Sequence, residues 1–283
     1  MLTITLDWFA ITHKEMTYEA HEFIIAFASP QDSTPERATN GYDTAYRTKD
    51  GVVHMWHSRR EEMGWHTVFS GSALRNIFIE NGISQRSLLE SAVNSGGRVS
   101  RLDLAKDAQD EHINLDEIYH HIRGKVYTGT ARNAAQMQSM NGGNTIYVGS
   151  RQSEKFIRIY DKAAQSELAA RDWKRYEIET KGMVARSLAQ LLVNESDWDA
   201  AWTTMAKGML DIPTSKEYQK FFAEQRSNVG IPKLERKSDR EKWILEQCLP
   251  AIVKHYSENR ISSAVRMLRD ALDLIDSTND AAG

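Results

Sequence analysis

Three segments of this 283-residue chain share a two-residue alternation that is typical of β-strands. In each segment, two apolar side chains spaced two residues apart alternate with mostly charged side chains. The segments are SRLDLAKD (100–107), FIRIYDK (156–162) and KRYEIETK (174–181). The pattern predicts three strands, each with one face buried beneath helices and the other face dense in carboxylates, arginines and lysines.

The rest of the chain alternates between strand and helix patterns. Further strands are expected at 2–10, in a hairpin at 42–58, at 64–71, and in a hairpin within 143–165 whose second strand is FIRIYDK. Helices are expected at 14–29, 72–81, 84–95, 114–125, 163–172, 183–194, 196–210 and 241–277. This order predicts an α+β fold with a mainly antiparallel central sheet and helices packed on one face.

A loop rich in polar and charged residues, 227–240, interrupts the pattern before the last predicted helices. We therefore expect two parts. Residues 1–225 would form the α+β catalytic domain, and residues 226–283 would form a linker and a C-terminal helical region.

The composition narrows the class of protein. The only cysteine is Cys248, so no disulfide framework or cysteine metal site is possible within this sequence. The net charge of −3 argues against non-specific coating of nucleic acid, although it permits a small basic site. There is no run of eighteen apolar residues and no basic, signal-like N-terminus, which predicts a cytoplasmic protein without a membrane partner.

The charged strand faces predict a metal site. Cross-strand ion pairs would explain one such strand, but facing carboxylates on several strands repel one another unless a cation lies between them. Asp103 with Glu177 or Glu179 would offer oxygen ligands suited to Mg²⁺ or Mn²⁺.

Tyr160 lies on the same predicted face as Arg158 and Lys162. A tyrosine hydroxyl is a weak nucleophile unless a metal and nearby cations polarise its target. Arg158 and Lys162 would neutralise a phosphate as its charge rises. The group therefore fits phosphoryl transfer through a covalent tyrosine.

Several neighbours have competing interpretations. Tyr147 is the rival nucleophile, but it lacks flanking cations on its face, so we favour a packing or DNA-stacking role for it. Arg101 and Arg175 are expected to support the acids through ion pairs. Asp107 could be an outer metal ligand or could cap a turn.

Two other functions remain open. Asp103 with Glu179 and Lys181 resembles the D…ExK pattern of metal-dependent nucleases that use water, and such an enzyme would not need Tyr160. A non-catalytic DNA-binding regulator could keep the fold without the chemistry.

The motifs RLDLAKD, TIYVGSRQSEKFIRIYDK and RYEIETKG resemble, in order and spacing, the core of Rep_trans-type rolling-circle replication initiators. The resemblance spans roughly residues 64–200, with weaker support from DWFAIT upstream. It implies an RRM-like catalytic core in which Tyr160 attacks a scissile DNA phosphate. It also implies that Asp103 and Glu177 hold the divalent ion, with Glu179 a less certain third ligand.

The resemblance further implies a biological role. Such initiators nick one strand at an origin, stay joined to the 5′ phosphate and leave a 3′ hydroxyl as a primer for a host polymerase. They commonly recruit a host helicase and often act as homodimers. The predicted C-terminal helices, 241–277, could serve dimerisation, origin recognition or helicase contact.

Overall fold

The structure is a computed structural model that describes residues 4–222, except 81, 110–111, 141–142, 166–171 and 195–196. All of these residues lie in the first of the two units into which the chain divides, Met1–Lys233. The predicted linker and C-terminal helices lie outside the described residues, so the division at residue 225 stays a prediction.

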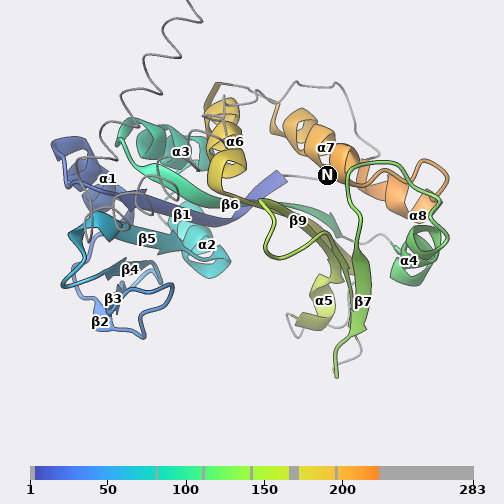
Figure 1. Cartoon of the computed structure of the whole chain (residues 1–283), viewed down its shortest axis with the longest axis horizontal. Coiled ribbons are helices and arrows are strands. Elements are labelled where there is room, and N and C mark those ends of the chain that lie inside the picture. Colours follow the sequence, from blue (N-terminus) through green and yellow to red (C-terminus); the bar gives the residue numbers. More distant parts are fainter. Residues whose placement is uncertain are drawn as a thin grey trace, which may run out of the picture. The chain divides into compact units, whose positions relative to one another are not determined.

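The described strands form one antiparallel sheet of ten strands in the order β2-β3-β4-β5-β1-β6-β10-β9-β8-β7 (Figure 1). The strands are β1 (Ile4–His13), β2 (Thr34–Pro35), β3 (Thr44–Arg47), β4 (Val53–Trp56), β5 (Trp65–Phe69), β6 (Arg98–Gln109), β7 (Ala134–Gln138), β8 (Asn144–Val148), β9 (Lys155–Asp161) and β10 (Trp173–Lys181). The predicted α+β class and antiparallel sheet are confirmed. The two edge strands, β2 and β7, were not predicted, because they are mostly exposed and show no alternation of apolar and polar residues.

The helices largely follow the predicted segments. They are α1 (Tyr18–Ala28), α2 (Gly71–Glu80), α3 (Gln85–Asn94), α4 (Leu115–Arg123), α5 (Lys162–Gln165), α6 (Gly182–Asn194), α7 (Trp198–Met209) and α8 (Lys216–Gln219), with 3-10 turns at Glu61–Met63 and Lys220–Phe222. Asn114 caps α4 as expected, since its side chain accepts hydrogen bonds from the backbone N–H groups of Asp116 and Glu117. Within the described part of the chain, no helix is long and apolar enough to cross a membrane.

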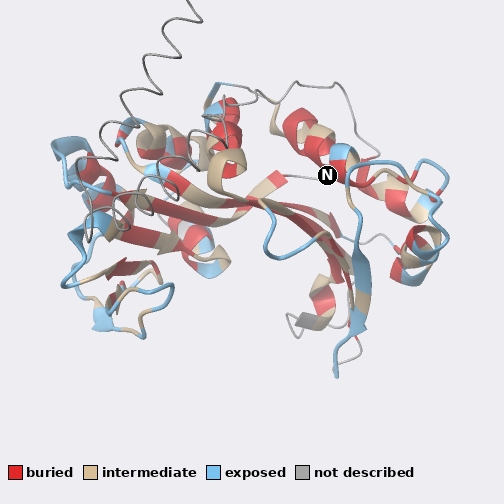
Figure 2. Ribbon diagram, viewed as in Figure 1, coloured by how far each residue is buried: buried red, intermediate tan, exposed pale blue. Residues whose placement is uncertain are grey.

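One face of the central strands is buried beneath helices. In Figure 1, α3, α6 and α7 lie above the sheet, whereas α2 and α5 lie below it. Buried residues follow the central strands and the sides of the helices that face them (Figure 2). The predicted apolar positions are each at most 1% exposed: Leu102, Leu104, Ile157, Ile159, Tyr176 and Ile178. This packed layer holds β6, β9 and β10 in place and leaves their charged faces on the other side of the sheet.

A bulge in β1 adds residues to the charged side. Leu6 pairs with Leu104 and Trp8 pairs with Asp103, so Asp7 is an extra residue between two matched pairs. Leu6 and Phe9 are both buried in the core. Asp7 and Trp8 are each only half-buried, and both project from the opposite face. Bulges commonly re-aim side chains in this way.

A buried ion pair joins the sheet to α7. Lys106 shares the core face of β6 with Leu104 and is completely buried. Its ammonium nitrogen lies 2.5 Å from Asp199 Oδ1 and 5.0 Å from the centre of the Trp202 ring. Asp199 retains 28% exposure of its side chain, so among the described residues the ammonium pairs with one partly hydrated carboxylate.

We predict that Asp199→Ala lowers the free energy of unfolding by about 3 kcal/mol, because it leaves a buried ammonium without a counter-charge. Urea denaturation followed by circular dichroism would measure the change. Lys106→Met combined with Asp199→Ala should recover most of the loss. Glu62→Ala is the control, since it breaks an exposed pair with Arg60 and should change stability by less than about 1 kcal/mol. A loss for Asp199→Ala no larger than that of the control would contradict the assignment.

Candidate active site

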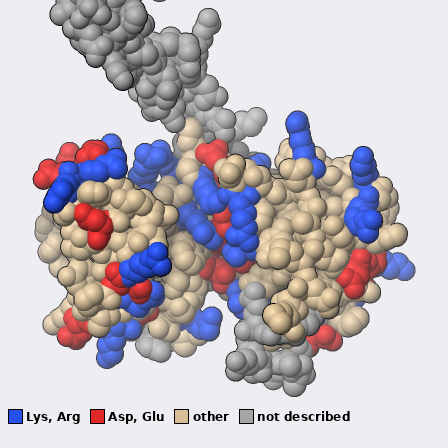
Figure 3. Space-filling view, turned by 60° about the horizontal axis from the view of Figure 1, so that its bottom comes forward, with Lys and Arg blue, Asp and Glu red and all other residues tan. Residues whose placement is uncertain are grey.

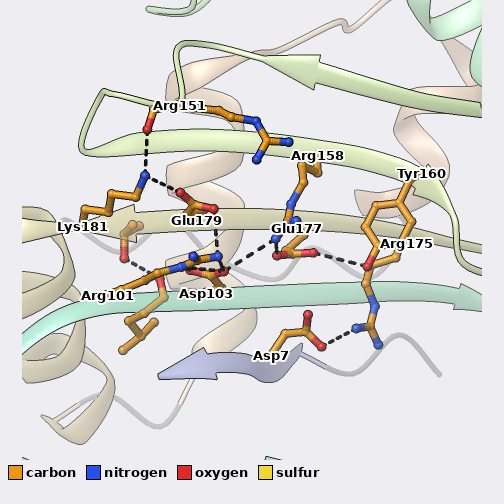
Figure 4. Close-up of polar contacts among 12 residues, drawn as sticks. Asp7, Arg101, Asp103, Arg151, Arg158, Tyr160, Arg175, Glu177, Glu179 and Lys181 are labelled. Carbon is orange, nitrogen blue, oxygen red and sulfur yellow. Dashed lines mark hydrogen bonds and ion pairs between the residues drawn. The ribbon is translucent and has the colours of Figure 1, made fainter. Parts of the chain in front are cut away.

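The charged faces of β1, β6, β10 and β9 form one continuous surface (Figure 4). The strand register places Glu179 opposite Asp103 on β6, and Glu177 opposite Arg158 on β9. Asp103, Glu177 and Glu179 are only 0%, 1% and 6% exposed. The predicted acids are therefore brought together. Figure 3 shows a group of Lys, Arg, Asp and Glu side chains at the centre of the view, with further charged side chains scattered over the two flanks.

Arginines lie between the buried acids. Arg101 Nη2 is 2.5 Å from Asp103 Oδ2 and 2.9 Å from Glu179 Oε2. Arg158 Nη2 contacts Glu177 Oε1 and lies 3.7 Å from Asp103 Oδ2. Each guanidinium thus joins two carboxylates from neighbouring strands, which confirms the supporting role expected for Arg101.

Burial shapes the protonation of these acids. It raises the pKa of Asp103, and Glu177 and Glu179 raise that pKa further, against the opposing effect of Arg101. Burial also raises the pKa of Glu177, while Arg158 lowers it. The arginines therefore compensate the buried carboxylates only in part, and the site favours an additional positive charge or a proton.

Tyr160 lies within this charged surface, not among aliphatic side chains. It is 5% exposed, and its hydroxyl donates a hydrogen bond to Glu177 Oε2 at 3.3 Å. Burial raises the pKa of the Tyr160 hydroxyl and Glu177 raises it further, whereas Arg175 and Arg158 lower it. The tyrosine is thus protonated in the resting protein, with a carboxylate in place to accept its proton.

Lys162 stands just beyond the end of β9. The sequence pattern continued the strand through Lys162, but the strand ends at Asp161 and Lys162 begins α5. Its ammonium nitrogen still lies 5.7 Å from the centre of the Tyr160 ring. Burial and Arg175 lower the pKa of Lys162. The two predicted cations, Arg158 and Lys162, therefore both lie near Tyr160.

Arg175 joins three strands beside Tyr160. Its Nε and Nη2 donate to the two oxygens of Asp107, each at 2.7 Å, and its Nη1 donates to Asp7 on the β1 bulge. Asp107 lies inside β6 and binds Arg175 with both oxygens, so it does not cap a turn. Asp7 was missed by the sequence analysis. The available signal was the three-residue spacing between Leu6 and Phe9, which breaks the alternation of β1.

The acids also permit a cation site. Among the described residues, no group of three or more His, Cys, Asp or Glu side chains is arranged to hold a metal ion. Mg²⁺ commonly takes only one or two protein carboxylates and completes its shell with water and substrate phosphate. Because the Arg101 nitrogen already bridges Asp103 and Glu179, that pair is spaced around a positive charge. A divalent cation held by these two carboxylates would therefore take the position that the Arg101 guanidinium now has.

The residues of two alternative interpretations, the D…ExK nuclease pattern and Tyr147 as nucleophile, also lie near this surface. Lys181 Nζ lies 2.6 Å from Glu179 Oε1, so the residues of the D…ExK pattern are close together. Tyr147 pairs with Arg158 across β8 and β9, and its ring stacks on Phe156. Tyr147 therefore lies one strand farther from the acids than Tyr160 does.

We predict that Arg175→Met lowers the free energy of unfolding by about 3 kcal/mol, because Asp7 and Asp107 would lose the guanidinium that bridges them. Arg175→Lys should recover part of the loss, since it restores the charge but not the two-pronged geometry. Urea denaturation would measure both variants. Arg47→Met removes an exposed pair with Glu36 and serves as the control. An Arg175→Met protein as stable as this control would refute the supporting role.

Comparison with known proteins places this surface in context. The sequence model described as replication initiation factor matches residues 97–276, which include Asp103, Tyr160 and Glu177 and extend beyond the predicted limit near residue 200. The rolling circle replication initiator protein from Geobacillus stearothermophilus has a similar fold. Its TM-score is 0.68, at 17% identity over 83% of this chain and 100% of that chain. No curated protein matches this chain.

Proposed function

Since the chain belongs to the replication initiation factor family, we propose that it nicks one DNA strand at an origin by attack of Tyr160 on a scissile phosphate. The observation that carries the proposal is the hydrogen bond of the Tyr160 hydroxyl to Glu177 within a buried acid–arginine surface. The product would be a 5′-phosphotyrosine and a free 3′ hydroxyl. That hydroxyl would prime a host polymerase for rolling-circle replication.

Tyr160 can form the new bond to phosphorus, and Glu177 can accept the proton that is released. Tyr160 Oη gives its proton to Glu177 as it attacks the phosphorus, and the bond from phosphorus to the 3′ oxygen breaks. The 3′ oxygen leaves with the bonding electrons and takes a proton from solvent. Because burial raises the pKa of Glu177, this carboxylate is a stronger base than an exposed one. Rejoining the strand would run the same step backwards.

Arg158 and Lys162 would stabilise the charge that develops on the phosphate. The Nε of Arg158 is buried and has no hydrogen-bond partner within the described part of the chain. A buried, unpaired N–H group is costly, so it favours an arriving acceptor such as a phosphate oxygen. Lys162 adds its charge from just beyond the end of β9, with its ammonium nitrogen 5.7 Å from the centre of the Tyr160 ring.

Asp103 would hold Mg²⁺ or Mn²⁺ together with Glu177 or Glu179. When bound, the cation polarises the phosphate. Of these two pairs, Asp103 with Glu179 leaves Glu177 free to accept the Tyr160 proton. This choice raises Glu179 from an uncertain third ligand to a principal one.

We also propose different roles for the two predicted parts of the chain. Residues 1–225 would carry out nicking, since they contain every residue of the charged surface. Residues 226–283 would serve DNA or protein partners, by origin recognition, homodimer formation or contact with a host helicase. The nick site would be offered as single-stranded or extruded DNA.

We predict that Tyr160→Phe abolishes the covalent protein–DNA product while leaving DNA binding intact, because only the hydroxyl oxygen is lost. Supercoiled DNA that carries the origin of the replicon encoding this protein would be incubated with Mg²⁺ and the protein. Denaturing electrophoresis would then detect the covalent product. Tyr147→Phe is the matched control and should form the adduct at a normal rate. Nicking that survives in Tyr160→Phe would exclude this mechanism.

We predict that Asp103→Asn raises the Mn²⁺ concentration needed for half-maximal nicking by roughly tenfold or more, because it removes a ligand. Glu179→Gln should act in the same direction. Glu36→Gln is the control. It changes an acid that directly follows β2 and pairs with Arg47, and it should leave the Mn²⁺ titration unchanged. Unaltered Mn²⁺ titrations in both site variants would refute the assigned ligands.

A second enzymatic function has a specific observation in its favour. Lys181 lies beside Glu179, which is the arrangement expected for hydrolysis by a metal-activated water. Such a nuclease would cut DNA without forming an adduct and would be indifferent to Tyr160→Phe. A non-catalytic regulator would bind DNA with neither product. The electrophoresis experiment on Tyr160→Phe therefore separates all three functions.

A further inference from the structure

The side chains of Tyr147, Phe156 and Arg151 lie together beside the turn that joins β8 to β9. The rings of Tyr147 and Phe156 are 5.9 Å apart between centres and inclined by only 20°. The guanidinium carbon of Arg151 lies 5.2 Å from the centre of the Tyr147 ring and 5.4 Å from that of Phe156. The guanidinium is therefore about equally close to the two rings.

The Arg151 guanidinium is bound by the rings alone within the described part of the chain. Its side chain is exposed, and no carboxylate lies within ion-pair distance of it there. The other arginines of this surface, Arg101, Arg158 and Arg175, each pair with acids. A cation that is held only by two ring faces is easily exchanged for another planar group, because exposed cation–π contacts are weak.

This cluster is joined to the proposed active site. Tyr147 pairs with Arg158 and Phe156 pairs with Glu179 across adjacent strands. Lys181 Nζ donates to the backbone oxygen of Arg151 at 2.7 Å and contacts Glu179 at 2.6 Å. The β8–β9 turn is thus tied to the acid that would hold the cation.

The backbone positions of Tyr147 and Tyr160 are close together on neighbouring strands. Thr145 is the residue that pairs with Tyr160, so Tyr147 lies one strand across and two residues along from it. One strand step is about 4.8 Å and two residues span about 6.7 Å, which gives a separation of about 8 Å. A nucleotide whose phosphate lies at Tyr160 can place a neighbouring base over Tyr147.

We propose that Tyr147, with Phe156 beneath the same guanidinium, is a stacking site for one unstacked nucleobase beside the scissile phosphate. The base takes the place where the Arg151 guanidinium now lies, and Arg151 moves to the DNA backbone. Stacking on an aromatic face accepts any base, so the site fixes the position of the strand rather than its sequence. Its position beside the scissile phosphate rests on the proposed function of Tyr160, whereas the stacking itself does not.

The competing explanation is that Tyr147 and Phe156 only pack against each other. The experiment therefore measures binding and not nicking, with Tyr160→Phe in every protein so that no adduct forms. A fluorescent single-stranded oligonucleotide from the element's origin, chosen because the Tyr160→Phe protein binds it, is changed to an abasic site at each position in turn. Tyr147→Val removes the ring and keeps a residue suited to a strand. Tyr147→Phe keeps the ring, and Tyr18→Val changes an exposed tyrosine on α1.

We expect one position at which the abasic change weakens binding to the Tyr160→Phe protein by about tenfold. Tyr147→Val should weaken binding of the intact oligonucleotide by a similar factor and should show no further loss at that position. Tyr147→Phe and Tyr18→Val should keep the abasic penalty. As a second readout, 2-aminopurine at that position should lose fluorescence on binding to proteins that retain the ring, and not with Tyr147→Val.

The proposal is overturned if the abasic penalty persists in Tyr147→Val, or if this variant binds the intact oligonucleotide as tightly as Tyr147→Phe does. Circular dichroism melting must show Tyr147→Val to be folded. If it is not, the 2-aminopurine quenching by the Tyr147→Phe protein decides, and its absence at every position overturns the proposal. Failure of Tyr160 as the nucleophile would appear only in the adduct experiment, so the two failures are distinguishable.

Discussion

The structure depends on guanidinium–carboxylate pairs that cross the strands on the charged face of the sheet. A buried carboxylate loses its hydration, and only a well-placed cation with good geometry offsets that cost. Arg101 and Arg158 supply that cation for the acids of β6 and β10. Arg175 does the same for Asp7 and Asp107, and so joins β1, β6 and β10. A one-residue slip of any of these strands would turn its charged side chains into the core, so these pairs and the core together fix the register.

The same pairs prepare the surface for DNA chemistry. Each arginine that compensates an acid in the resting protein is also a group that binds phosphate in a forked geometry. A substrate phosphate near Arg158 would compete with Glu177 and Asp103 for it, and a cation would take over the compensation of those acids. The same arginines and carboxylates would thus stabilise the fold and bind the substrate. An exchange between them needs no large movement of the backbone.

The sequence predicted this face because alternation on a strand has a fixed period. Arg101, Asp103, Arg158, Glu177 and Tyr160 could be assigned to one side of a sheet without any coordinates. Alternation says which face a residue occupies but not which partner it meets, so the ion pairs and the cation site could not be separated. The β1 bulge hid Asp7, since one inserted residue shifts every later position. The contact of Arg151 with the rings of Tyr147 and Phe156 could not be predicted from the sequence either, because Arg151 lies in a turn, where side chains follow no regular period.

The placement of Tyr160 on a strand rather than a loop bears on the chemistry. Ile157 and Ile159 anchor β9 in the core on either side of Arg158, and β10 holds it along its length. A nucleophile on such an element keeps its position relative to Glu177, so little reorganisation is needed before attack. The end of β9 at Asp161 then turns Lys162 toward the Tyr160 ring. In the proposed mechanism, the apolar face of the sheet would therefore act on catalysis indirectly, by fixing the distance between the Tyr160 hydroxyl and the Glu177 carboxylate.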